Sequence, residues 1–194
     1  YMKGVISVAH GSAHTVILKN IGTVFSCGWN NYGQLGIGNT TFYDRFMPIL
    51  DIGGSNVLRD ISAIGCGALW SHFVKKNGTV YGCGNNTYGN IGDNTTTQRN
   101  SIVQVVGIGG AGVLTDVKQV VGGFGNNNVT LFLRNDGTVC GCGNKVFGTL
   151  GDNTTTQRNA PVQMLEVNGI TFINNVKQIC TNISTSVLLK NDGT

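Results

Sequence analysis

Residues 22–36, GTVFSCGWNNYGQLG, carry the pattern that decides the fold of this chain. The pattern returns as GTVYGCGNNTYGNIG at residues 78–92 and as GTVCGCGNKVFGTLG at residues 137–151, and a fourth copy begins at Gly193. The Gly-Thr steps are 56, 59 and 56 residues apart, and such a period marks a stacked array of small structural units. We therefore predict one repeat domain. Its repeats span approximately residues 5–60, 61–116, 117–175 and, in part, 176–194.

Each repeat contains four short segments of strand character. In the second repeat these are residues 61–64, residues 70–75, a segment from Thr79 and residues 102–106, and Asn77-Gly78 favours a tight hairpin between the second and third. Both alternating rows of the second segment are apolar or small, which indicates a strand covered on both faces. Four antiparallel strands per repeat, packed face to face, describe β-propeller blades. We predict an all-β fold with an open array of about 3 to 3.5 blades. The expected fourth strands are residues 47–50, 102–106 and 162–165.

The composition excludes several other classes of protein. Gly, Asn and Thr are abundant and form helices poorly, so a helical bundle is excluded. The net charge of +4 is mild and no basic run exceeds Lys75-Lys76, which disfavours a nucleic-acid partner. No apolar stretch reaches the roughly 20 residues of a membrane helix, so we expect no membrane insertion.

The six cysteines do not form a pattern typical of a metal site. Cys27, Cys83 and Cys142 occupy one equivalent place in successive repeats, which indicates a small packing position. The only close pair is Cys140-Gly141-Cys142, and zinc sites need Cys-x-x-Cys or Cys/His spacing. We expect structural thiols and no bound metal.

No set of residues predicts catalysis or cofactor binding. The chain has three histidines and no triad of His, nucleophile and orienting carboxylate, and we expect His14 to bond within its own blade. Residues 107–112, GIGGAG, match the dinucleotide fingerprint in letters, but a β segment and not a helix should follow them. The sequence therefore predicts no enzyme and no cofactor.

Two polar features recur between repeats. The octapeptide DNTTTQRN occurs at residues 93–100 and 152–159, and we interpret it as a capped turn in which the Arg bonds to the Asp or to carbonyls, and not as a calcium loop. A basic residue also ends the second segment of every repeat. If these cations are more than solvated hairpin ends, they form a rim that binds an acidic protein or polysaccharide. The candidate rim residues are Lys19, Lys75, Arg134 and Lys190.

The recurring Gly-Thr-Val and Cys-Gly-x-Asn-x-x-x-Gly-x-x-Gly, together with His14-Thr15 and Val5-x-x-Val8, resemble the repeats of the regulator of chromosome condensation family. That resemblance implies a seven-bladed propeller, of which this chain would supply a little over three blades. The remaining blades are then expected from the same polypeptide, or from another chain.

Two functions remain open at this point. The first is a non-enzymatic scaffold that presents loops to a protein or polysaccharide partner. The low charge and the abundant Gly, Asn and Thr suggest an extracellular or virion appendage, such as a fibre or receptor-binding protein. The alternative, which the resemblance implies, is guanine-nucleotide exchange on a Ran-like small GTPase with chromatin association.

Overall fold

The chain folds into a row of small antiparallel sheets, and the computed structural model describes residues 2–125, 128–144, 148–183 and 185–194. Residues 145–147, which belong to the third copy of the glycine-rich pattern, lie outside the described part. Three successive repeats each form a four-stranded sheet with its strands in chain order, and the partial repeat forms a two-stranded sheet. The strands are β1 (Val5–His10), β2 (His14–Lys19), β3 (Val24–Gly28), β4 (Tyr43–Pro48), β5 (Ile61–Cys66), β6 (Trp70–Lys75), β7 (Val80–Gly84), β8 (Arg99–Gln104), β9 (Val117–Gly122), β10 (Val129–Arg134), β11 (Val139–Gly143), β12 (Arg158–Gln163), β13 (Val176–Thr181) and β14 (Ser186–Lys190).

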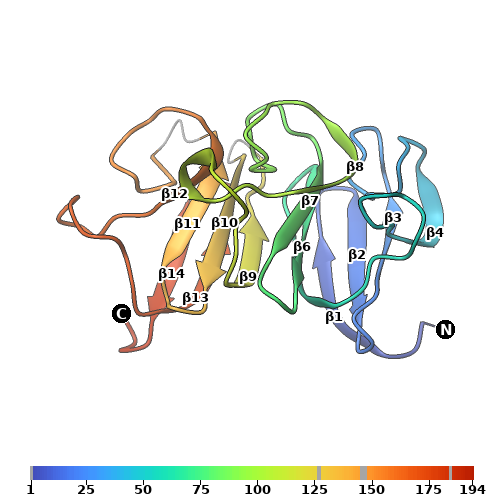
Figure 1. The fold of residues 1–194 in the computed structure, drawn as a ribbon, viewed down its shortest axis with the longest axis horizontal. Coiled ribbons are helices and arrows are strands. Elements are labelled where there is room, and N and C mark those ends of the chain that lie inside the picture. The colour runs from blue at the N-terminus through green and yellow to red at the C-terminus, as the bar shows by residue number, and fades with distance from the viewer. Residues whose placement is uncertain (1, 126–127, 145–147, 184) are drawn as a thin grey trace.

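The sheets are blades of a β-propeller, as the repeat pattern predicts. Figure 1 shows them side by side in chain order, from the blue first blade to the red half blade. β5 contacts both β1 and β9, and β9 contacts β13, so the first strands of neighbouring blades lie together like the inner strands of a propeller. A 3-10 turn, η1 (Ile108–Gly110), lies within the GIGGAG segment, and the next element of the chain is the strand β9, not a helix. Within the described residues no helix is both long and apolar enough to span a bilayer.

Apolar layers between the blades hold the array together. Phe73 of β6 packs against Val16 and Leu18 of β2, and Phe132 of β10 packs in the same way against Val74 of β6. Both rings are fully buried. Burying a side chain of this kind contributes roughly 1.5 to 3 kcal/mol. The second strands β6 and β10 are therefore covered on both faces, as the sequence predicts.

The outermost blades keep apolar faces that have no neighbour among the described residues. Val8 on β1 is 62% exposed, whereas its equivalent Val120 on β9 is 2% exposed. Val187 on β14 is 56% exposed, whereas its equivalent Leu131 on β10 is fully buried. The array is open at both ends.

The prediction for the fourth strands was wrong by a few residues. β4, β8 and β12 begin at Tyr43, Arg99 and Arg158, in polar sequence, and end before the predicted segments do. These are edge strands whose outer side faces solvent, so their polar halves pair with the third strand without an apolar pattern. The apolar residues that suggested strands further on instead form single bridges. These are Leu50 with Val57, Val106 with Val113 and Leu165 with Phe172.

Candidate functional site

Each contact between neighbouring blades includes one backbone carbonyl of a glycine-rich loop. We call the contact between two neighbouring blades a joint. In the joint between blades 1 and 2, the Gln34 carbonyl of blade 1 accepts a hydrogen bond from the Ser71 hydroxyl of blade 2. The other two joints repeat this bond, so a hydroxyl near the start of the second strand fixes each blade to the one before it. The three bonds are Ser71 to Gln34 at 2.8 Å, Thr130 to Asn90 at 2.7 Å and Ser186 to Thr149 at 3.0 Å.

Two of the recurring cysteines, Cys83 and Cys142, lie in the same joints, whereas Cys27 of the first blade is half-buried. Cys83 Sγ is 3.6 Å from the Gln34 carbonyl, and Cys142 Sγ is 3.6 Å from the Asn90 carbonyl. Burial raises the pKa of both thiols, so they remain protonated and can act as weak donors. All six cysteines are free thiols. Cys83 and Cys142 therefore occupy packing positions, now located between blades.

His14 bonds across a joint and not within its own blade, which corrects the prediction made from the sequence. Its Nε2 lies 2.9 Å from Ser71 Oγ. Because the Ser71 proton is given to the Gln34 carbonyl, Nε2 must carry a proton and donate it. In the next joint Trp70, the equivalent of His14, donates Nε1–H to Thr130 at 2.9 Å. A side chain at the start of the second strand thus reaches the following blade.

A second part of each joint depends on close backbone approach. A Cβ on Gly33 would lie 2.4 Å from Asn100 Cα, and a Cβ on Gly89 would lie 2.6 Å from Asn159 Cα. Both glycines also have a positive φ, of 80° and 75°. Each asparagine is the second residue of a fourth strand, so only glycine allows the preceding blade to approach that strand.

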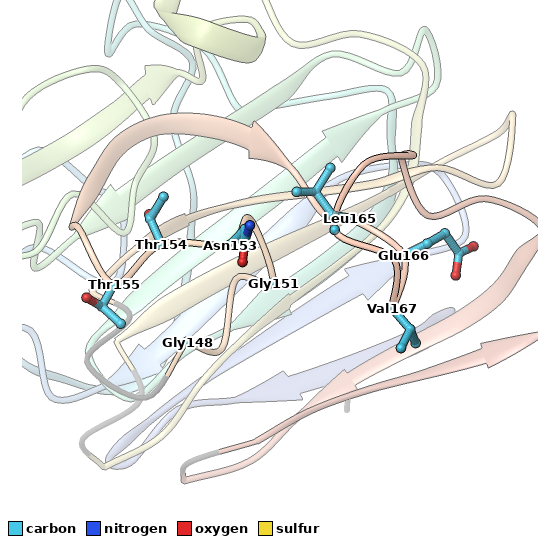
Figure 2. Close-up of a pocket in the computed structure, with 9 residues that line it drawn as sticks. Gly148, Gly151, Asn153, Thr154, Thr155, Leu165, Glu166 and Val167 are labelled. Atoms are coloured by element: carbon cyan, nitrogen blue, oxygen red, sulfur yellow. The ribbon is translucent and has the colours of Figure 1, made fainter.

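The corresponding place in blade 3 is open. Gly148, the equivalent of Gly89, has no atom of the described residues within 4 Å of the position of a Cβ. The Asn94 amide donates to the Asn159 carbonyl at 2.9 Å, but the described residues supply no such acceptor to Asn153, the equivalent of Asn94. A cavity of about 600 Å³ results. Figure 2 shows this cavity, with Asn153 on one side and Leu165 to Val167 on the other.

The four predicted rim cations end β2, β6, β10 and β14, at equivalent positions of their blades. Two of these cations each contact an aromatic ring and no charged group of the described residues. Lys19 Nζ lies 5.5 Å from the centroid of the Phe25 ring, and Lys75 Nζ lies 5.4 Å from that of Tyr81. Neither lysine forms an ion pair with a described carboxylate, and a cation over a ring keeps its charge.

The other two rim cations form ion pairs. Arg134 Nη1 lies 3.0 Å from a carboxylate oxygen of Asp136, and Arg134 Nη2 lies 3.9 Å from one of Asp116. Lys190 Nζ lies 2.8 Å from a carboxylate oxygen of Glu166. The rim is therefore uneven in charge, with net positive character concentrated at Lys19 and Lys75.

The repeated octapeptide is a structural turn, as interpreted from the sequence. Asp93 accepts a hydrogen bond from Arg99 Nε at 2.6 Å and bonds to the amide and hydroxyl of Thr95. Asp152 and Arg158 repeat the ion pair at 2.9 Å. Because these carboxylates are already bound by arginine, they are poor calcium ligands. Among the described residues no three His, Cys, Asp or Glu side chains gather as metal ligands would.

Two features of the site were missed from the sequence. One is the hydrogen bond from a hydroxyl to a carbonyl of the preceding blade. A Thr or Ser nevertheless stands at the position of this hydroxyl in every repeat, at Thr15, Ser71, Thr130 and Ser186. The other is Lys118, which the structure brings beside Lys75 and Lys76 in a groove between two hairpins. The alternating polarity of the second strand could have indicated the hydroxyl. The position of Lys118 depends on how blades 2 and 3 lie relative to each other.

Comparison with known proteins identifies the repeat. Residues 5–34 and residues 22–73 match family models described as Regulator of chromosome condensation (RCC1) repeat. The chain is 29% identical over 161 residues to the Ultraviolet-B receptor UVR8 of Arabidopsis thaliana, a match that covers 81% of this chain and 33% of that protein. It is 32% identical over 85 residues to the Secretion-regulating guanine nucleotide exchange factor of Bos taurus, covering 44% of this chain and 18% of that protein.

Solved structures agree with the propeller fold. Human WBSCR16 superposes with a TM-score of 0.75 at 26% identity, over 98% of this chain and 46% of that one. Yeast RCC1 (Prp20), solved with Kap60 bound, superposes with a TM-score of 0.71 at 19% identity, over 99% of this chain and 43% of that one. The chain spans less than half the length of each of these four proteins.

Proposed function

This chain is built from repeats of the regulator of chromosome condensation family, and we propose that it acts as a non-enzymatic scaffold that binds a protein partner through the rim of its blades. The observation that carries the proposal is that a cation ends the second strand of every blade, and that the joints hold these blades in fixed positions. Rigid elements present binding groups precisely. A relative named as a receptor supports recognition as a role for such repeats.

We also propose that the array is one sector of a larger propeller. The fourth strand of a completed half blade would fill the cavity beside Gly148 in the way that Asn159 fills the place beside Gly89. The blade after that one would cover Val187. This occupant is favoured over a small ligand because the same place is filled by protein backbone in the other two joints.

The finer parts of the functional hypothesis have unequal support. Placement on an extracellular or virion appendage rests on composition alone, since neither relative compared above is named as such a protein. A polysaccharide partner likewise draws no support from them. A protein partner is the form of the proposal that we retain.

The proposal predicts that protein binding depends on the two rim cations that lack a carboxylate partner. Changing Lys19→Ser and Lys75→Ser together should reduce capture of protein partners, identified by mass spectrometry, by about tenfold at low salt. Arg134→Ser with Lys190→Ser removes the same charge from paired cations and should cost about twofold or less. Equal capture by the wild type and the Lys19/Lys75 variant would contradict the proposal.

Guanine-nucleotide exchange on a Ran-like GTPase is the second candidate. It is favoured by the bovine relative, whose name describes an exchange factor, although the match covers only 18% of that protein. The assay is release of labelled GDP from the GTPase with and without the full-length protein. Acceleration of release would favour exchange, and an unchanged rate would favour the scaffold.

A further inference from the structure

A groove of about 450 Å³ lies between the hairpins of blades 2 and 3. It is lined mainly by cations and neutral hydrogen-bonding groups. No aromatic side chain is among its lining residues. They are Ser62, Lys75, Lys76, Asn77, Gly78, Asp116, Val117, Lys118 and Asn135.

The charge of this groove is positive. Lys76 and Lys118 are exposed and form no ion pair with the described residues. The single carboxylate among the lining residues, Asp116, is already engaged, because its Oδ1 accepts a bond from Asn135 Nδ2 at 2.9 Å and its Oδ2 lies 3.9 Å from Arg134. An anion entering the groove therefore meets three ammonium groups that form no ion pair, those of Lys75, Lys76 and Lys118. Asp136 lies near enough to Lys118 for the lysine charge to help lower the pKa of its carboxyl.

The backbone that carries these groups is fixed. The Lys76 amide donates to the Asp60 carbonyl at 2.7 Å, and the Asn135 amide donates to the Asp116 carbonyl at 2.8 Å. Both bonds tie a hairpin to the start of its own blade. The Val117 amide also donates to the Gly78 carbonyl at 3.1 Å, which ties the hairpin of blade 2 to the first strand of blade 3. The walls of the groove are thus fixed within and between the two blades, which lowers the cost of ordering it on binding.

The other hairpin gaps lack this concentration of lysines. Between blades 1 and 2, the positions of Lys76 and Lys118 are occupied by Asn20 and Ser62. Between blade 3 and the half blade, Lys177 stands at the position of Lys118, but Asn135 stands at the position of Lys76. The repeat architecture does not require lysines here, so this gap differs from its neighbours in chemistry and not in fold.

We propose that this groove binds an acidic peptide segment of a protein partner. The inference rests on the proposed scaffold function and locates the contact. A peptide fits because spaced carboxylates can pair with Lys76 and Lys118, while Asn77 Nδ2 can donate to a backbone carbonyl and Ser62 Oγ can accept from a backbone amide. A nucleic-acid strand fits less well, because Asp116 interrupts the positive path and no lining ring can stack on a base.

The test measures binding of one defined probe to the full chain. A fluorescein-labelled peptide of alternating Glu and Gly is titrated by fluorescence anisotropy, beside a Gln/Gly peptide and a DNA oligonucleotide of equal charge. Lys76→Gln with Lys118→Gln removes the groove cations. Lys3→Gln with Lys177→Gln is the matched control, because both residues are exposed, lie outside the groove lining and remove the same net charge.

We expect the groove variant to bind the acidic peptide about tenfold more weakly, and the control variant to lose about twofold or less. Equal losses in the two variants, no binding of the acidic peptide, or tighter binding of the oligonucleotide would each overturn the inference. The scaffold proposal is judged separately, because capture of partners by the Lys19/Lys75 variant does not involve this probe. If partner capture still depended on Lys19 and Lys75 while the acidic peptide failed to bind as expected, only the groove proposal would be rejected.

Discussion

Lowering the pH from about 7 to about 4 is expected to remove about 6 kcal/mol from the free energy of unfolding of this chain. The cause is two buried histidines. Burial lowers the pKa of His14 and of His72 from 6.5 to about 4 in the folded chain. Each histidine therefore contributes about 3 kcal/mol to the change, which is large against the roughly 5 to 15 kcal/mol that stabilises a typical domain.

The direction of the effect follows from proton binding. Between pH 6.5 and pH 4 the unfolded chain protonates both rings while the folded chain keeps them neutral, so acid favours unfolding. In His14 the Nε2 proton is donated to Ser71 and Nδ1 has no hydrogen-bond partner. A second proton would therefore create a buried positive charge, which the Trp70 backbone offsets only in part. The carboxyl groups of Asp51, Asp136 and Asp192 have pKa values below 3.8 and lose their contribution only at lower pH.

Urea unfolding at several pH values measures the effect, and the repeats supply a matched variant. Leu131 occupies the place of His72 in the next blade and is fully buried there, so His72→Leu should fold and should remove about half of the pH dependence between 6.5 and 4. His14→Gln should remove the other half while keeping a donor for Ser71. A pH dependence that is unchanged in both variants would show that other groups cause it.

The architecture could be predicted from the sequence because the same pattern occurs in several repeats. The spacing of Gly22, Gly78 and Gly137 predicts the blades, and two-sided apolar strands such as β6 predict their packing. Edge strands were placed less well, since β8 starts at Arg99 and is polar for half its length. A strand at the rim of a sheet buries one side only, so its pattern is weak.

The site was less predictable than the fold because its properties depend on pairs of blades. The sequence placed Lys75 and Arg134 at equivalent positions, but it could not show that Arg134 forms ion pairs with Asp136 and Asp116. It also could not bring Lys118 beside Lys76, which lies on another blade and 42 residues away in the chain. Such juxtapositions follow from the register between sheets, which the repeat pattern does not encode.

Gly89→Ala should destabilise the chain far more than Gly148→Ala, although both glycines have a similar positive φ, of 75° and 70°. The backbone cost of alanine there is about 1 to 2 kcal/mol in each variant. At Gly89 the new methyl group would also lie 2.6 Å from Asn159 Cα and 3.0 Å from the Arg158 carbonyl, so the blades must separate. The total cost should reach about 3 to 5 kcal/mol.

At Gly148 the same methyl group meets no atom of the described residues, so only the backbone cost of about 1 to 2 kcal/mol should appear. Chemical denaturation of the two variants measures the difference directly, and equal losses would contradict the joint as described. The same pair also tests the proposed larger propeller. In a longer chain that completes the half blade, Gly148→Ala should become as costly as Gly89→Ala, because the fourth strand of that blade would then occupy the cavity beside Gly148. If the cost stayed small there, that cavity would not be a joint between blades.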